Sequence, residues 1–312
     1  MASGEELHRR GVVELTLGNF AEAQGLLEQV RALAMSEGDA ALQARADSTL
    51  AYMAADESDL DNALGLLEQA LDVGGSDTEI RGLMLQQRAT LLRRAGRPTE
   101  ALATFGDAID ALVTRHRDLA IAYVNRGTVY LDQHNVEAAV MDFSAAAANF
   151  RAEGDEVAAA MADHNRGYAL FIGGDLVGAL EVMAGCYEVQ AAAGPLLKAV
   201  CDADRAEVLM AAGLTGQGGA MLRQAAEAYG SKGQRQRQGE AELVLASHLV
   251  ATDPTEAEQV ARSALGWFEE AKAPGLALRA RAVAFEAAVT AGGAPSDDGE
   301  ELAVPLEEQG LS

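Results

Sequence analysis

The chain has 312 residues, of which 49% are apolar, 23% charged and 4% aromatic, which is enough apolar material for one large or two ordinary domains. Its net charge of −24 creates a field that repels phosphate backbones and anionic lipids, so we expect neither nucleic-acid nor membrane binding. No apolar run is long enough to span a membrane. The N-terminal segment 1–6 contains two glutamates and lacks the apolar core of a signal peptide. We therefore expect an acidic, cytoplasmic protein, and its Ala- and Gly-rich composition suggests a bacterial source.

A short phrase of turn residues recurs along the chain. In each copy a helix stop is followed by a polar or proline residue and a new helical start. The copies occupy residues 18–23, 58–63, 96–101, 134–139, 174–179, 213–218 and 253–257. The small residues that close successive copies are 38 to 40 positions apart, so the pattern predicts seven tandem units.

Small and large apolar residues keep fixed offsets within each unit. The fourth unit has Gly127, Tyr130, Ala139, Phe143 and Ala146. Small residues let two antiparallel helices approach closely, and large ones fill the space between units. No useful stretch alternates with the period of a half-buried strand. We predict a repeat array over residues 3–292, with units of about 3–38, 39–75, 76–116, 117–153, 154–193, 194–233 and 234–273, a half-unit at 274–292, and an acidic linker or tail at 293–312.

These offsets resemble the tetratricopeptide repeat (TPR), which combines a small residue, an aromatic, a turn, an alanine and a phenylalanine. The usual repeat is about 34 residues long, so the longer units here resemble its long-helix subclass. Glu14 and Gly218 depart from the pattern. The resemblance implies an all-α fold, a right-handed α-solenoid of about seven helical hairpins plus a terminal helix.

Residues 80–89, 124–127, 164–169 and 204–215 also resemble the N-terminal repeat region of bacterial proteins that carry a C-terminal CHAT domain, a caspase-like peptidase module. This second resemblance extends over about 7–291. A CHAT module needs a mixed α/β fold that presents a His and a Cys, and the repeats supply no such fold. The resemblance therefore implies a sensing or docking half, with no peptidase activity of its own.

Four consecutive units place a polar residue, an arginine and a small residue at the same phase. The polar and basic members are Gln87 and Arg88, Asn125 and Arg126, Asn165 and Arg166, and Asp204 and Arg205. Equal phase in a solenoid predicts a spatial row with one member per unit. The resemblance to the tetratricopeptide repeat implies that the residue before each arginine faces the concave groove, as it does in related arrays. Amide side chains there can bond an extended peptide backbone, and arginines can bind its carboxylates. The alternative is that the arginines pack between hairpins and pair with acids such as Asp107, Asp110 or Asp142.

Three aromatic residues, Tyr52, Tyr168 and Phe171, share the groove-facing phase of the predicted first helices. They are candidates to anchor a ligand side chain, with inter-repeat packing as the alternative. His8 and His164 have the same phase but lie in distant units, so they cannot ligate one metal ion together.

Cys186 and Cys201 occupy inward positions of their helices, which predicts buried, inert thiols because a catalytic thiolate needs partial exposure and a nearby base. The group Lys232, Arg235 and Arg237 predicts a solvated basic loop or, alternatively, a docking spot. We predict no metal site and no cofactor.

The sequence thus predicts a non-catalytic scaffold that binds a protein or peptide segment in the groove of a TPR solenoid. The partner belongs to another protein or to a C-terminal domain of the same polypeptide. The negative field favours a basic partner, whereas the arginine row favours an acidic one. The alternatives are the regulatory N-terminal part of a CHAT-type peptidase and the ligand-sensing array of a signalling regulator.

Overall fold

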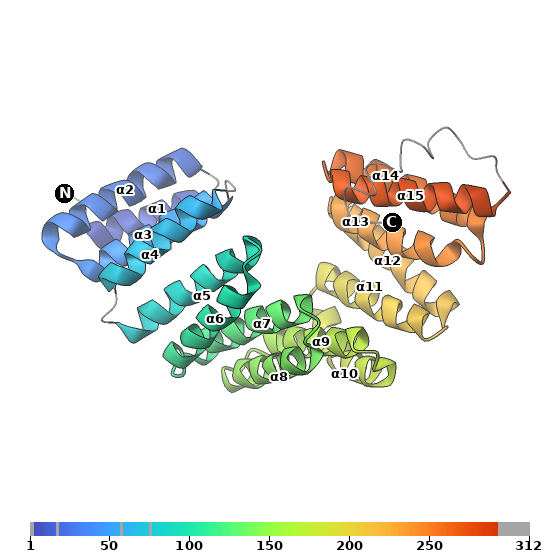
Figure 1. The fold of residues 1–312 in the computed structure, drawn as a ribbon, viewed down its shortest axis with the longest axis horizontal. Helices are drawn as coiled ribbons and strands as arrows, with labels where there is room; N and C mark the ends of the chain where they lie inside the picture. Colours follow the sequence, from blue (N-terminus) through green and yellow to red (C-terminus); the bar gives the residue numbers. More distant parts are fainter. Residues whose placement is uncertain (1–2, 17–18, 57–58, 75–76, 293–312) are drawn as a thin grey trace. The chain divides into compact units, whose positions relative to one another are not determined.

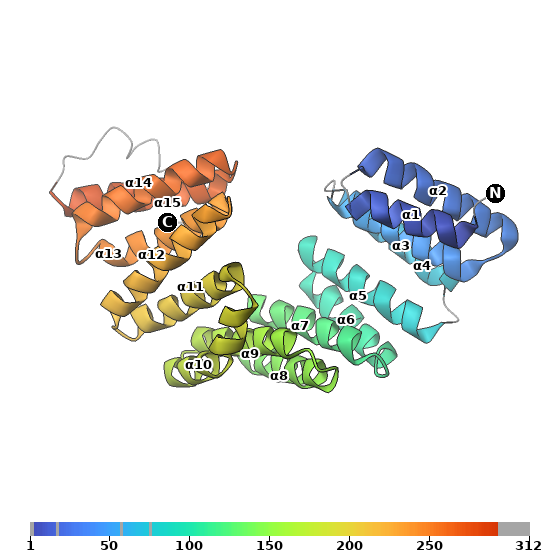
Figure 2. The ribbon, with the colours of Figure 1, turned by 180° about the vertical axis from the view of Figure 1, so that it is seen from behind.

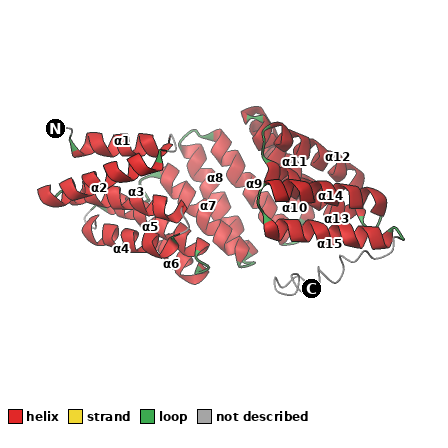
Figure 3. Ribbon diagram, turned by 90° about the horizontal axis from the view of Figure 1, so that it is seen from above, coloured by secondary structure: helices red, strands yellow, loops and turns green. Residues whose placement is uncertain are grey.

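The computed structural model describes residues 3–16, 19–56, 59–74 and 77–292, and these residues form fifteen α-helices and no strand (Figures 1 and 3). This confirms the all-helical fold predicted from the sequence, while the predicted acidic tail lies outside the described residues. In order, the helices are α1 (Gly4–Thr16), α2 (Phe20–Glu37), α3 (Ala40–Asp56), α4 (Leu60–Gly74), α5 (Thr78–Arg94), α6 (Pro98–Ala111), α7 (His116–Asp132), α8 (Val136–Ala152), α9 (Glu156–Ile172), α10 (Leu176–Ala193), α11 (Pro195–Ala211), α12 (Thr215–Ser231), α13 (Arg235–Leu249), α14 (Pro254–Glu270) and α15 (Pro274–Thr290).

Contacts within the chain divide it into two compact units, Met1–Ala162 and Asp163–Ser312. The first unit contains α1 to α8 and the beginning of α9, and the second contains the rest of α9 and α10 to α15. Within each unit consecutive helices pack as antiparallel hairpins, as α3 with α4 and α13 with α14 (Figures 1 and 2). None of the helices in the described ranges combines the length and the hydropathy that a bilayer crossing requires.

Several hairpins are closed by a glycine on the first helix that faces a large residue on the second, as Gly11 faces Leu27 and Gly167 faces Met183. In the fourth hairpin Gly127 of α7 lies under the ring of Phe143 on α8, so that a Cβ at Gly127 would stand 2.9 Å from Cε1 of that ring. Phe143 is 1% exposed, and Ala139 and Ala146 on the same helix are fully buried. Close approach of two helices therefore depends on glycine and alanine here, as the offsets in the sequence predicted.

The recurring phrase of the sequence is the turn between the two helices of a hairpin. Gly174, before α10, has the left-handed φ of 86°, and His134 takes the same place before α8 with φ 56°. Asn135 then caps α8, because its Oδ1 accepts a hydrogen bond from the backbone N–H of Ala138 at 3.3 Å. The phrase thus combines a left-handed helix stop with the cap of the next helix.

Successive hairpins stack through apolar clusters. In the first unit Phe105 of α6, fully buried, packs with Leu92 of α5 and with Val129 of α7 in the following hairpin. In the second unit Leu222 and Tyr229 of α12 form a cluster with residues of α11 and α13. This stacking brings the first helices of neighbouring hairpins side by side and so positions the side chains considered next.

Candidate functional site

Arg126, a member of the predicted arginine row, is bound within its own hairpin. It donates from Nε and Nη2 to the carboxylate of Asp142 on α8, at 2.7 and 2.8 Å. The Asp142 side chain is 7% exposed, and its hydrogen bond raises the pKa of Arg126. The guanidinium also lies over the rings of Tyr123 and Tyr130, 5.5 and 5.8 Å from their centroids. Arg126 therefore offers no free guanidinium to a ligand carboxylate.

Arg88 of α5 reaches across its hairpin in the same way. Its Nη1 donates to Oγ1 of Thr104 on α6 at 3.4 Å. Thr104 follows Arg88 by sixteen residues, the separation that also relates Asp142 to Arg126. The residue sixteen positions later thus supplies the partner of the arginine in these two hairpins.

The two arginines of the row in the second unit have different partners. Sixteen residues after Arg166 stands the apolar Val182, and Arg166 pairs with Asp163 one turn earlier on α9, at 2.9 Å. The guanidinium of Arg205 on α11 lies 5.7 Å from the ring centroid of Tyr187 on α10. The four arginines therefore contact groups of this chain and do not form a uniform row of open guanidinium groups.

The polar residues that precede these arginines differ in availability. Gln87 accepts from Oγ of Ser48 on α3 at 2.6 Å and donates to the backbone carbonyl of the same residue at 3.0 Å, so its amide is occupied. Asn125 of α7 and Asn165 of α9 are half-buried and have no hydrogen bond to another side chain or to the backbone among the described residues. These two amides have spare donors and acceptors.

The predicted aromatic anchors occupy two environments. Tyr52 of α3 is 58% exposed. Tyr168 and Phe171 of α9 are half-buried and form an edge-to-face pair with centroids 5.7 Å apart. Burial, reinforced by the negative charges of Glu207 and Asp204, raises the pKa of Tyr168 to about 12. The phenol of Tyr168 therefore lies close enough to these two carboxylates to sense their charge.

A pocket of about 130 Å³ opens beside these carboxylates in the second unit. It is lined by side chains of α11, α12 and α13, namely Val200, Ala203, Asp204, Glu207, Leu222, Tyr229, Arg237, Glu240, Ala241 and Val244. Burial, and then the charge of Asp204, raises the pKa of Glu207 to about 7. The pocket combines apolar walls with charged groups at the place where α11, α12 and α13 meet, which makes it the candidate functional site.

His164 of α9 supports the pocket. The residue is 4% exposed, and its Nε2 lies 2.8 Å from Oδ2 of Asp204. One oxygen of Asp204 is thereby held by a buried ring, which orients the carboxylate. This role differs from metal binding, and the described residues contain no group of three or more His, Cys, Asp or Glu side chains arranged to hold an ion.

Sequence reasoning found part of this pocket. It singled out Asp204 as a polar member of the repeated row and noted Arg237 in a basic group, but it missed Glu207 and Glu240. Asp204 and Glu207 lie one turn apart on α11, a signal that can be read from the sequence. Glu240 reaches the pocket from α13 through the stacking of hairpins, and no repeat spacing relates it to Glu207.

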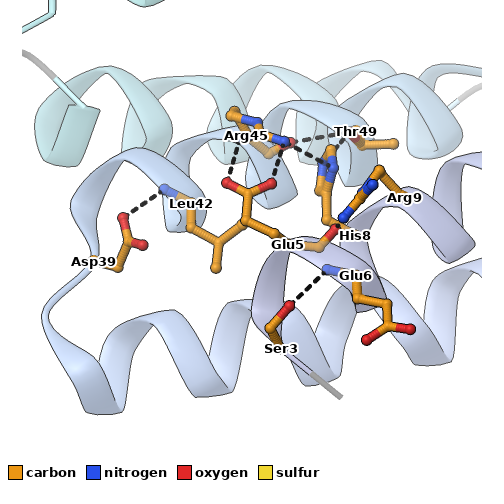
Figure 4. Close-up of polar contacts among 9 residues, drawn as sticks. All are labelled: Ser3, Glu5, Glu6, His8, Arg9, Asp39, Leu42, Arg45 and Thr49. Atoms are coloured by element: carbon orange, nitrogen blue, oxygen red, sulfur yellow. Dashed lines mark hydrogen bonds and ion pairs between the residues drawn. The ribbon is translucent and has the colours of Figure 1, made fainter.

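His8 has a structural position in the first unit (Figure 4). Arg45 of α3 donates two hydrogen bonds to the carboxylate of Glu5 on α1, at 2.8 and 3.1 Å, and its Nη2 lies 3.3 Å from Nδ1 of His8. Because arginine only donates, Nδ1 accepts and the ring is neutral. Burial, and then the charge of Arg45, lowers the pKa of His8. The group ties α1 to α3.

The two cysteines are buried in the second unit. Sγ of Cys201 donates to Oε1 of Gln190 at 2.7 Å, and burial raises the pKa of Cys201 to about 12. A thiol that stays protonated is a poor nucleophile. Cys201 therefore serves packing and a buried hydrogen bond.

No protein-family model matches the chain, and no curated protein does. Solved structures share its fold. A STAND signal-transduction ATPase with a tetratricopeptide repeat sensor, from Pyrococcus horikoshii, has a TM-score of 0.73 at 13% identity, over 99% of this chain and 49% of that one. The apo form of the quorum sensor NprR from B. thuringiensis has a TM-score of 0.71 at 9% identity, over 99% of this chain and 88% of that one. A tetratricopeptide repeat protein from Parabacteroides merdae has a TM-score of 0.60 at 16% identity, over 89% of this chain and 98% of that one.

These similarities define the class of the fold: the chain is a TPR-like array of helical hairpins. Identities of 9 to 16% establish the fold alone. The chain spans about half (49%) of the length of the Pyrococcus STAND protein.

Proposed function

We propose that this chain is a non-catalytic scaffold that binds a peptide segment of a partner protein on the first helices of its second unit. The observation that carries this proposal is the pocket between α11 and α13, which lies in the same unit as the unoccupied amide of Asn165. An amide with free donor and acceptor can pair with an extended backbone, and a neighbouring pocket can receive a side chain. Such a surface recognises a segment through main-chain hydrogen bonds and one anchored residue.

Selection of a random 12-residue peptide library on the full chain tests this proposal. We expect enriched peptides whose affinity falls about tenfold in Asn165→Ala, because the variant loses hydrogen bonds made in a half-buried place. Fluorescence anisotropy with a labelled enriched peptide gives the dissociation constants. Asn62→Ala, at an exposed position of α4, is the matched control and should bind as the wild type does.

Thermal unfolding of both variants separates binding from folding. Asn165→Ala should melt within about 2 °C of the wild type, because this amide makes no hydrogen bond within the described part of the chain. The proposal is wrong if no peptide is enriched, or if the enriched peptides bind Asn165→Ala and the wild type equally.

A second candidate is the ligand-sensing array of a longer signalling regulator. It is favoured by the likeness to a STAND protein with a tetratricopeptide repeat sensor, of which the chain spans 49%, and to a quorum sensor. In this version the bound segment is the signal, and a catalytic or output domain lies outside this chain. The regulatory part of a CHAT-type peptidase is a special case that rests on the sequence resemblance alone, and immunodetection of the native gene product by mass separates it from a free-standing scaffold of 32.5 kDa.

A further inference from the structure

The pocket of the second unit has the lining that a long amphipathic side chain requires. Leu222 of α12 and Ala241 of α13 are buried, and Val200 and Val244 are half-buried, so one side of the pocket is apolar. Its volume of about 130 Å³ suits a single side chain. Apolar walls that lead to charged groups match a residue with a methylene stem and a charged head.

The charges in the pocket are unequal. Asp204, Glu207 and Glu240 contribute three carboxylates, and Arg237 contributes the single cation. The guanidinium of Arg237 is directed to Tyr229, 5.9 Å from the centroid of its ring. No ion pair within the described residues joins Arg237 to any of these carboxylates, which leaves the pocket with negative charge to be matched.

Glu207 is the least satisfied of the three carboxylates. Oδ2 of Asp204 lies 2.8 Å from Nε2 of His164, and Oε1 of Glu240 accepts a hydrogen bond from Nε2 of Gln236 at 2.9 Å. Glu207 has no hydrogen-bond or ion-pair partner among the described residues, and burial beside Asp204 raises its pKa to about 7. A half-buried carboxylate without a donor carries a desolvation cost that an incoming cation would offset.

We propose that this pocket binds the cationic side chain of an arginine or lysine in the partner peptide, with the head group between Glu207, Asp204 and Glu240 and the stem against Leu222 and Val244. This inference rests on the proposed function and names the chemistry of its anchor residue. Of the opposed expectations from the sequence it favours a basic partner, because Arg126 and Arg166 of the row pair with carboxylates of this chain and the pocket holds three carboxylates and one cation. The field of a chain with net charge −24 further concentrates cations at this surface.

The test uses two probes of equal shape, N-acetylarginine methylamide and N-acetylcitrulline methylamide, which differ in charge. The full chain is labelled with 3-fluorotyrosine, and the ¹⁹F signal of Tyr229 is assigned by its loss in Tyr229→Phe. We expect the arginine probe to shift this signal saturably and the citrulline probe to need at least about tenfold higher concentration. Equal titration curves for the two probes would overturn the proposal.

Two pairs of variants separate the pocket from the bulk field. Glu207→Gln should weaken binding of the arginine probe about tenfold, whereas Glu227→Gln, which removes the same charge from an exposed position of α12, should change it less than about twofold. Arg237→Gln should strengthen binding because it removes the competing cation, and Arg223→Gln, an equal change of net charge outside this pocket, should not. Equal effects within either pair would show that only net charge matters and would refute the site.

The two proposals fail separately. If selected peptides bind and depend on Asn165 but lack a cationic residue that Glu207→Gln affects, the scaffold stands and the cationic anchor is refuted. If the arginine probe binds in the pocket while no library peptide does, the anchor chemistry stands and the peptide-binding function is refuted. Circular dichroism of each variant at the titration temperature verifies that it is folded.

Discussion

Asp47 of α3 is a carboxylate buried in the repeat interface. Its side chain is 0% exposed, and Nε of Arg31 on α2 lies 2.9 Å from its Oδ1. Nη2 of Arg31 also donates to Oε1 of Gln69 on α4 at 3.0 Å, so a single guanidinium joins three helices. Burial raises the pKa of Asp47, and the charge of Arg31 opposes this effect. A side-chain hydrogen bond with Gln43 also lowers the pKa of Asp47, so Arg31 and Gln43 together stabilise a buried carboxylate.

We predict that Arg31→Gln lowers the free energy of unfolding by roughly 2 to 3 kcal/mol at pH 7, because it removes the cation that pairs with a buried carboxylate. The estimate lies at or just below the low end for breaking a buried pair, since Arg31 is 32% exposed and water can partly replace it. Asp47→Asn should cost less, because it removes the buried charge and leaves a partly exposed arginine. Urea unfolding followed by circular dichroism measures both.

The pH dependence of the same variants provides the check. A carboxyl whose pKa is raised in the folded state contributes stability that is fully present below its unfolded pKa and is lost as pH rises through the folded pKa. Arg31→Gln should raise the folded pKa of Asp47 further and so widen this loss, and in Asp47→Asn the loss should disappear. A larger cost for Asp47→Asn than for Arg31→Gln would contradict this account.

At the scale of the helix pair, the distance between α7 and α8 depends on Gly127. A Cβ there would meet three atoms of the Phe143 ring at 2.9 to 3.2 Å, and this ring is 1% exposed. We predict that Gly127→Ala lowers the free energy of unfolding by about 1 to 2 kcal/mol through overpacking, although alanine is the better helix former. Urea titration again gives the value.

Gly106 of α6 is the matched control, because it also lies within a helix but nothing stands within 4 Å of a Cβ there. Gly106→Ala should therefore stabilise the chain by about 0.5 to 1 kcal/mol. If both alanines stabilise the protein, the helices can separate without cost and the close approach at Gly127 is unimportant.

Arginines at the same position of different repeats have different side-chain partners, so the repeat position alone does not determine which residue an arginine contacts. Arg126 finds Asp142 on the next helix, and Arg166, at the same phase, has Val182 in the corresponding place and turns to Asp163. The helix thus presents an arginine at a fixed phase, and the opposite helix determines its contact. The partner of each arginine therefore cannot be predicted from the position of the arginine in the repeat.

At the scale of the whole chain, a net charge of −24 opposes folding through self-repulsion. Ion pairs that join neighbouring hairpins, such as Arg93–Asp132 and Arg117–Asp155, act against it, but their arginine side chains are 39% and 62% exposed. Exposed pairs contribute about 0 to 1 kcal/mol each. We therefore expect repulsion to dominate at low salt.

The prediction is that the melting temperature rises between about 10 and 150 mM NaCl, over which the screening length falls from about 30 to 8 Å. Choline chloride at equal ionic strength should act like NaCl if the effect is screening, which serves as the control for specific sodium binding. A melting temperature that falls with salt would show that the ion pairs between hairpins outweigh the net charge.

The sequence by itself determined the helical hairpins, the position of their turns and the glycine that allows α7 to meet α8. These features follow from local rules, since helical periodicity, turn residues and small-to-large offsets act within about forty residues. It also singled out Asp204, Asn165 and Tyr168, because residues of one phase share one face.

Only the tertiary structure decided what these side chains contact. It paired Arg126 with Asp142, left the amide of Asn165 without a hydrogen bond to any residue that the structure describes, and brought Glu240 of α13 to the same pocket as Glu207 of α11. The physical reason is competition: each polar group pairs with whichever donor or acceptor the stacking of helices brings within reach, and that depends on several helices at once. A repeat period places a residue on a face, whereas its neighbours across the interface determine whether it stabilises the fold or remains open to a ligand.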